Sequence, residues 1–146
     1  MADWSDLGSA KKNGMTGPKR ARPAGASDAA VAAVGKLSEA LERMENARGH
    51  LYAFHQLSGA TDLALQDAVA ALRDAGFGPL AAAIDEALVG RDVAAGRWTY
   101  ELVEDYDDGY ARVFREVERR VRHQVMGGVR HVYEAEMQFD EQQPRG

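Results

Sequence analysis

Apolar residues recur at spacings of three and four from residue 27 to residue 142, which is the period of amphipathic helices. Ser27 can cap the first of these helices, and no helix-breaking residue follows until Gly59. We therefore expect a first long helix over residues 27–58, about 48 Å in length at roughly 1.5 Å per residue.

The next two helices are bounded by glycine and proline. One is expected to begin at Thr61 and to end at Gly76, where Phe77 suits a Schellman ending that folds an apolar side chain back onto the helix. The other is opened by Pro79 and closed by Gly90. Both are expected to be short.

A second long helix is expected to start at Thr99, which can serve as its cap, and to end at the double glycine 127–128. Trp98 precedes the cap and is placed to pack on Val103 as a hydrophobic staple. A last helix is expected over residues 129–142. The core-facing stripe of the second long helix is expected to be Val103, Tyr106, Tyr110, Val113, Val117 and Val121.

The sequence has no alternating strand pattern and no internal repeat of 20 to 50 residues. It predicts an all-α fold, a helical bundle of about five helices, two long and three shorter, over residues 27–142. Residues 143–146 are expected to be a disordered C-terminus. We expect an apolar core and ionisable groups that mostly stay in contact with water.

Residues 1–26 differ from the rest of the chain in charge and composition. Five basic against two acidic residues give them a net charge of +3 in a chain of net charge −5. They are rich in glycine and proline and lack periodic apolar residues, so we expect a disordered basic arm. Trp4, an isolated aromatic, suits a short docking peptide, but we favour an arm that only adds solubility and folds against nothing.

Two stripes of the first long helix compete for the core. Their shared members are Leu37, Met44, Leu51 and Ser58. The first stripe adds Val34, Leu41, Arg48 and His55, and the second adds Ala33, Ala40, Ala47 and Phe54. A buried Arg48 needs a partner because an unpaired buried charge costs several kcal/mol, so we expect the charge-free second stripe to face the core.

The first stripe would instead create a polar cluster between the two long helices. Asp107 is the best partner for Arg48, because it alone of the carboxylates from 101 to 108 lies about 60° from the centre of the apolar stripe. A histidine beside a carboxylate can bind a ligand or transfer protons. Under this alternative the chain is a small-molecule-binding or metal-binding bundle, with enzyme activity as an extension, and its ligand-binding residues are Glu45, Arg48, Tyr52, His55 and Asp107.

The sequence lacks the usual signatures of metal sites and catalysis. It contains no cysteine, which excludes disulfides, thiolate zinc sites and thiol nucleophiles. His50 and His55 lie about 140° apart around one helix and cannot share an ion, and the Glu-x-x-His pattern of di-iron bundles is missing. We expect no metal, no cofactor and no catalytic residue, and favour a protein that is not an enzyme.

The charges of the second long helix are expected to be structural. Its acidic residues lie at the beginning and its arginines at the end, as the helix dipole favours. Glu116 and Glu118 interrupt the arginines, so we do not expect a nucleic-acid partner.

The remaining candidates are an exposed loop and two glycines within helices. We expect Gly49 and Gly109 to allow close helix approach, with contact to a partner as the alternative. The loop, with the arm, supplies the candidate partner-binding residues Trp4, Arg91, Asp92, Arg97 and Trp98.

These observations favour a non-enzymatic helical interaction or regulatory protein that binds a protein partner or a second copy of itself. Its apolar stretches are shorter than the roughly 20 residues of a membrane span and it shows no signal peptide, so we expect a cytoplasmic protein. High alanine and a preference for arginine over lysine suggest a GC-rich bacterial genome.

Overall fold

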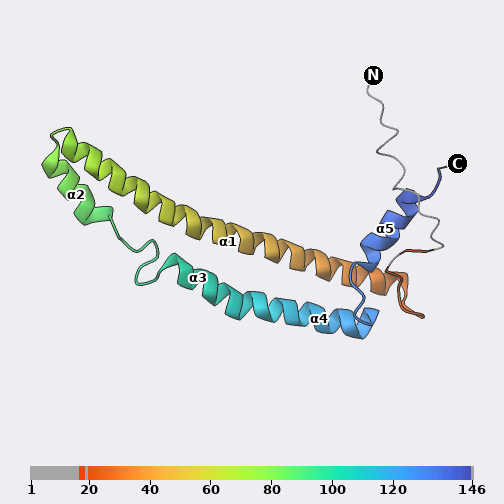
Figure 1. Cartoon of the computed structure of the whole chain (residues 1–146). Helices are drawn as coiled ribbons and strands as arrows, with labels where there is room; N and C mark the ends of the chain where they lie inside the picture. Colours follow the sequence, from red (N-terminus) through yellow and green to blue (C-terminus); the bar gives the residue numbers. More distant parts are fainter. Residues whose placement is uncertain (1–16, 19, 146) are drawn as a thin grey trace, which may run out of the picture. The chain divides into compact units, whose positions relative to one another are not determined.

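The computed structural model describes residues 17–18 and 20–145, and the regular elements within these residues are all helical (Figure 1). The all-α prediction is therefore confirmed. The helices are α1 (Asp28–Asp74), α2 (Gly78–Leu88), α3 (Thr99–Tyr106), α4 (Arg112–Met126) and α5 (Val132–Gln142). A π-helical segment, η3 (Asp107–Ala111), joins α3 and α4 into one continuous helix. The described residues therefore contain four continuous helices.

Helix α1 continues through Gly59, where the sequence analysis placed a break, so the first two expected helices are one. A single interior glycine costs a helix about 1 kcal/mol, and the good helix formers on both sides outweigh that. The helix ends as expected at Gly76, which has a φ of +90°. The Phe77 N–H donates to the Leu72 carbonyl at 2.8 Å, which is the Schellman bond.

Replacing Gly59 with alanine is expected to stabilise the chain by about 0.5–1 kcal/mol. A Cβ at Gly59 would meet no atom within 4 Å, so only the gain in helix propensity remains. Gly76→Ala is the matched control and is expected to destabilise, because its φ of +90° strains any side chain. Chemical denaturation of both variants measures this, and a loss of stability in Gly59→Ala would contradict a continuous α1.

Gly49 and Gly109 have the same open surroundings as Gly59. A Cβ at either position would meet no atom within 4 Å. The expectation that these glycines allow close helix approach is therefore wrong within the part of the chain that the structure describes.

The described residues divide into two compact units, those up to residue 42 with those from residue 114 onward, and residues 43–113. In the first unit, Val31 and Val34 of α1, Met126 of α4 and Val132 of α5 form a buried apolar cluster. The Ala30 N–H donates to Ser27 Oγ at 3.1 Å, so Ser27 caps α1 as expected.

Arg22 ties the segment before α1 to the first unit. Its Nε and Nη2 donate to the two carboxylate oxygens of Glu136 at 2.8 and 2.9 Å. Its Nη1 donates to Asp28 Oδ1 at 2.7 Å, and these bonds raise the pKa of Arg22 above its ordinary value. Arg22 thus contacts α5, while the predictions for Trp4 and residues 1–16 lie outside the described residues.

A buried ion pair in the first unit departs from the expected apolar interior. Glu118 and Arg122, on α4, are only 5% and 7% exposed, and Arg122 Nε donates to Glu118 Oε1 at 2.9 Å. Ser38 Oγ donates to the same oxygen at 3.3 Å, and Arg122 Nη1 donates to the Gly128 carbonyl at 2.7 Å. Full hydrogen bonding is what makes such a pair tolerable away from water. The expectation that ionisable groups stay in water is wrong for these two residues.

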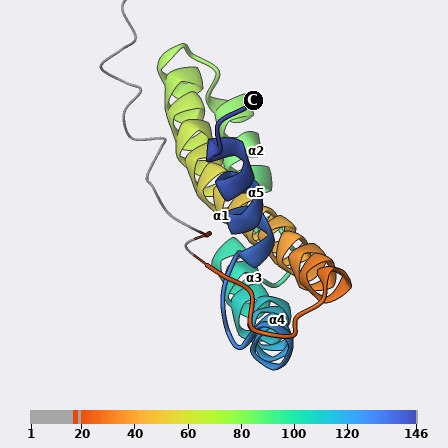
Figure 2. The same ribbon diagram turned by 90° about the vertical axis from the view of Figure 1, so that its right-hand side faces the viewer.

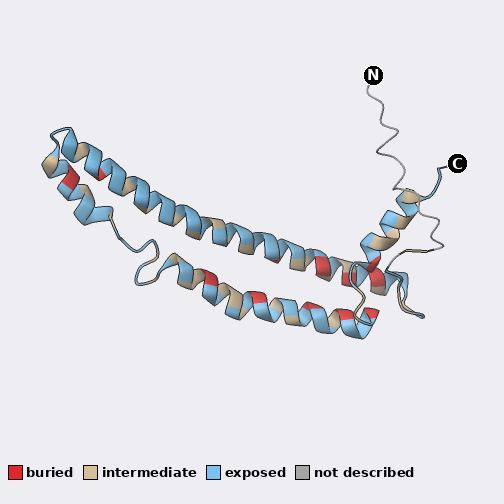
Figure 3. Ribbon diagram, viewed as in Figure 1, coloured by how far each residue is buried: buried red, intermediate tan, exposed pale blue. Residues whose placement is uncertain are grey.

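In the second unit, α2 lies beside the C-terminal part of α1 in both views (Figures 1 and 2). Ala81 of α2 and Val69 of α1 are buried there. Farther along, Met44 of α1 and Val103 of α3 are also buried. The buried apolar residues of this unit are valine, alanine and Met44, whereas its leucines and aromatic residues stay half-exposed or exposed (Figure 3).

The π segment changes which side of the second long helix faces inward. Its i→i+5 hydrogen bonds place one more residue in the turn than α geometry allows. The residues that face inward are therefore four positions apart. Val103 and Ala111 are buried, and Asp107 between them is half-buried. The expected core stripe assumed unbroken α geometry and is wrong for three residues that lie exposed, Tyr110, Val113 and Val117.

Candidate functional site

The side of α1 with Arg48 and His55, not the charge-free stripe, faces inward in the second unit. Arg48 and His55 are half-buried, whereas Ala47 is exposed and Phe54 is 46% exposed. The preferred stripe is therefore wrong. The assumption behind it was that a charge at this position would lack a partner, and the structure supplies one.

That partner is Asp107. Arg48 Nε donates to Asp107 Oδ1 and Arg48 Nη2 to Asp107 Oδ2, both at 2.9 Å, which is the bidentate geometry of a strong charge-assisted pair. The hydrogen bonds to Asp107 raise the pKa of Arg48 above its ordinary value, and the negative charge of Glu45 adds to the same effect. Asp107 is the first residue of η3, so the π segment begins where the pair forms.

An aromatic column extends from this pair along α1. The Arg48 guanidinium carbon lies 5.5 Å from the centre of the Tyr52 ring, a cation–π distance. The rings of Tyr52 and His55 are 5.9 Å apart, and those of His55 and Tyr100 are 5.5 Å apart. Four of the five residues predicted as a polar cluster are thus linked in a chain of contacts, from Asp107 through Arg48 and Tyr52 to His55. The fifth, Glu45, is exposed and acts on Arg48 through its charge.

Thr99 completes this cluster and was assigned another role from the sequence. His55 Nδ1 and Thr99 Oγ1 are 2.7 Å apart, so Thr99 contacts His55. No side-chain cap bond forms at the start of α3. Thr99 lies 44 positions beyond His55 along the chain. No spacing in the sequence links Thr99 or Tyr100 to His55, and only the fold brings them near.

The cluster fits binding better than proton transfer. Asp107 holds Arg48 in its charged form with both carboxylate oxygens, and His55 is hydrogen-bonded to a hydroxyl rather than to a carboxylate. The partly exposed Arg48 guanidinium and the exposed Tyr52 side chain offer a charge and an aromatic ring to a planar or anionic group.

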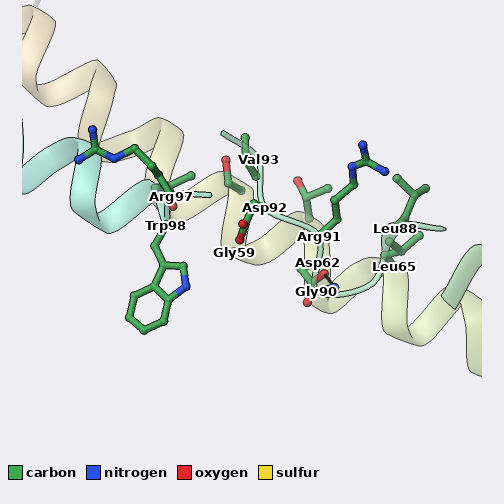
Figure 4. A pocket seen from close by; sticks show the side chains of 13 residues that line it. Gly59, Asp62, Leu65, Leu88, Gly90, Arg91, Asp92, Val93, Arg97 and Trp98 are labelled. Atoms are coloured by element: carbon green, nitrogen blue, oxygen red, sulfur yellow. Dashed lines mark hydrogen bonds between the residues drawn. The ribbon is translucent and has the colours of Figure 1, made fainter. Parts of the chain in front are cut away.

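A second feature of the same unit is an open pocket of about 610 Å³ beside the loop after α2 (Figure 4). Its apolar walls are Leu65, Leu88 and Val93. The four loop residues that the sequence analysis selected as partner-binding candidates all line it: Arg91, Asp92, Arg97 and Trp98.

Trp98 is 70% exposed, although the sequence predicted that it would pack on Val103. The staple expectation is wrong, because Trp98 is itself the N-cap residue of α3, one position later than a staple residue stands. Its indole points away from the other labelled lining residues (Figure 4). The largest side chain of the loop is therefore left at the surface beside the pocket.

The charged residues of the pocket differ in how far they are paired. Arg97 is ion-paired with Asp105 and lies 3.8 Å from Glu101, so its guanidinium points toward α3. Arg91 Nη1 donates to the Ala87 carbonyl at 3.5 Å. No carboxylate partner of Arg91 is found among residues 20–145, which leaves its charge available at the rim.

Asp62 joins the loop to α1. Its Oδ1 accepts from the Gly90 N–H and its Oδ2 from Gln66, both at 2.9 Å. The bond from the Gly90 N–H, followed by that from Gln66, lowers the pKa of Asp62 below its ordinary value. A lowered carboxyl pKa means that the folded state favours the ionised form.

The Asp62–Gly90 contact is expected to be constant from neutral pH to about pH 4 and to weaken as the pH falls further. The unfolded carboxyl titrates near 3.9, so the contribution is complete above that value and is lost as pH falls through the lower pKa of the folded state. The chemical shift of the Gly90 amide against pH measures this. Asp62→Asn should abolish the titration, and a Gly90 shift that moves in that variant would contradict the assignment.

One group of side chains could hold a metal ion. Donor atoms of Glu42, His131 and Glu134, in the first unit, lie within 4.8 Å of one another, and all three residues are exposed. This is a convergence between helices that the sequence did not reveal. Exposed carboxylates commonly gather without an ion, so the donor set alone assigns no metal site.

No helix among the described residues combines the length and the apolar character that crossing a bilayer requires. Comparison with known proteins gives no match to this chain, whether with family models, with curated proteins or with solved structures.

Proposed function

We propose that this chain is a non-enzymatic helical interaction protein that binds a protein partner at the pocket of residues 43–113. The observation that carries the proposal is Trp98, 70% exposed at the edge of an open pocket with apolar walls. Tryptophan and arginine dominate the energetics of protein interfaces, and Arg91 lies on the same rim.

The chemistry of the pocket suggests what the partner offers. Leu65, Leu88 and Val93 suit an apolar side chain, and the rim position of Arg91 suits a carboxylate. Arg97 contributes less, because Asp105 already neutralises it. A partner segment with an apolar residue near an acidic one fits both requirements.

The test begins with capture of partners from the protein's own cells, identification of each by mass spectrometry, and binding of the purified partner to the full chain. Trp98→Ala is expected to weaken that binding about 30-fold, the effect of a hot-spot loss of about 2 kcal/mol. Tyr110→Ala is the matched control, because Tyr110 is an exposed aromatic of the same unit outside the pocket lining. Equal binding by the wild type and Trp98→Ala would overturn the proposal.

A second candidate function is small-molecule binding at Arg48, Tyr52, His55 and Asp107. It is favoured by the π segment that begins at Asp107, because π segments are frequent at functional sites. The cluster would then bind a planar or anionic ligand rather than a protein.

His55→Ala is expected to lower stability by about 1 kcal/mol, since it removes one hydrogen bond of a half-buried side chain. Thr99→Val should cost a similar amount, and the double variant should cost little more than either alone. Thermal denaturation measures all three. Additive losses would show that the contact between His55 and Thr99 contributes nothing.

A further inference from the structure

The exposed indole of Trp98 stands on a backbone that its neighbours hold in place. Trp98 directly precedes α3, and its backbone is extended, with φ −74° and ψ 147°. Its carbonyl accepts a hydrogen bond from the Glu101 N–H at 3.0 Å. No hydrogen bond or ring contact of the indole itself is found among residues 20–145. The polar contacts that hold this segment are therefore those of the residues next to Trp98.

The residue before Trp98 is held only by nearby parts of the chain. The Arg97 guanidinium is ion-paired with Asp105 and lies 3.8 Å from Glu101, both in α3. The Arg97 N–H donates to the Ala94 carbonyl at 2.9 Å. These partners lie within eight positions of Arg97, so they shape the loop and the start of α3. They do not attach the loop to α1.

The residues after Trp98 are attached to α1 through His55. His55 Nδ1 and Thr99 Oγ1 are 2.7 Å apart, and the His55 and Tyr100 rings are 5.5 Å apart. A second bond between the loop and α1, from the Gly90 N–H to Asp62, lies eight residues before Trp98. His55 is thus the residue of α1 that contacts the immediate neighbours of Trp98.

This attachment matters because α1 also forms a wall of the pocket. Leu65 of α1 lines the pocket, as does Thr99. Holding Thr99 against α1 therefore sets where the Trp98 backbone stands relative to that wall. With the backbone fixed, a tryptophan has only two side-chain torsions left to order. A side chain that is ordered in advance costs less free energy to bind.

We propose that His55 is a positioning residue of the partner-binding pocket, which through Thr99 holds Trp98 in place before the partner arrives. The inference rests on the proposed function, because it concerns how the proposed binding site is kept in shape. His55 itself is not among the lining residues. It therefore acts on a partner through Thr99 and Trp98 and not by contact.

NMR relaxation of the full chain tests the ordering without any partner. The order parameter of the Trp98 backbone amide is expected to be about 0.85 in the wild type and below about 0.6 in His55→Ala. The reason is that the loop would then be attached to α1 only at its far end, through Gly90. Thr99→Val should behave as His55→Ala, and Thr99→Ser, which keeps the hydroxyl, should behave as the wild type.

Two controls separate positioning from general loosening. His50→Ala removes an exposed imidazole from the same helix and should leave the order parameter of Trp98 unchanged. The amide of Ala81, buried in α2 of the same unit, should stay near about 0.85 in every variant. An unchanged Trp98 amide in His55→Ala, or an equal fall at Ala81, would overturn the positioning role.

Binding of the purified partner from the capture experiment measures the consequence. His55→Ala is expected to weaken that binding about fivefold, the usual scale for the cost of ordering one side chain on binding. The double variant of His55→Ala with Trp98→Ala should bind no more weakly than Trp98→Ala alone, because His55 acts through Trp98. Losses that multiply in the double variant would overturn that route.

The outcomes distinguish this inference from the proposed function. Partner binding that Trp98→Ala weakens and His55→Ala does not would overturn only the positioning role. Partner binding that ignores Trp98→Ala would overturn the proposed function, and the order parameters would still report whether His55 holds the loop.

Discussion

Replacing Glu118 with alanine is expected to lower the free energy of unfolding by about 3–5 kcal/mol, the usual effect of removing one partner of a buried ion pair. Arg122 would remain 7% exposed with its charge uncompensated, and Ser38 would lose its acceptor. For a chain of this length the loss corresponds to a fall in Tm of roughly 10–16 °C. Thermal and urea denaturation of the variant measure it.

Two further variants show that burial is the cause. Glu116→Ala, on the same helix, removes an exposed carboxylate that pairs with Arg119 and Arg120, and should change stability little. Those two arginines lower the pKa of Glu116 to about 2. The double variant Glu118→Leu with Arg122→Met should recover most of the loss, because it leaves no charge buried. A Glu118→Ala protein as stable as Glu116→Ala would contradict the buried pair.

Met126→Ala is expected to cost about 2–5 kcal/mol, because it removes the largest fully buried side chain of the described residues and leaves a cavity. Met126 is 0% exposed and packs against Val31, Val34 and Val132, which come from two other helices. The loss should therefore loosen α5 as well as the end of α4. Urea denaturation gives the energy, and hydrogen exchange of α5 reports the loosening.

The neighbouring Val125→Ala provides the control for Met126→Ala. Val125 is 38% exposed, so its truncation removes less buried surface and should cost under about 1 kcal/mol. Equal costs for the two variants would mean that the apolar cluster of the first unit is not its stabilising core.

The fold could be predicted from the sequence where a single residue controls the backbone. Ser27 caps α1, and Gly76 ends it with a left-handed residue, because these effects are local. The predicted break at Gly59 was wrong, since one glycine costs too little free energy to end a helix that packs on both sides of it. The π segment was missed because one additional residue in a turn leaves no composition signal.

The sequence predicted that Asp107 would be the partner of Arg48, but it predicted neither the side of α1 that faces inward nor the contact of Thr99 with His55. The angular position of Asp107 identified the partner of Arg48, which the structure places at 2.9 Å. The preference for the charge-free stripe failed because it treated Arg48 as an isolated charge, whereas the structure pairs Arg48 with Asp107. Glu118 and Arg122 were missed for the opposite reason. Their spacing of four is also typical of exposed pairs, and only tertiary packing buries this one.

The hydrogen bonds of Arg22 have a consequence for trimming the chain. The Arg22 guanidinium is held by Glu136, Asp28 and the Ala26 carbonyl, and the peptide bond after Arg22 leads into Pro23, which trypsin does not cleave. Arg20, two residues earlier, makes a single longer bond of 3.4 Å to the Arg130 carbonyl and is exposed. Brief digestion that cuts after Arg20 should therefore give a fragment that begins at Ala21 and keeps the contact between Arg22 and α5.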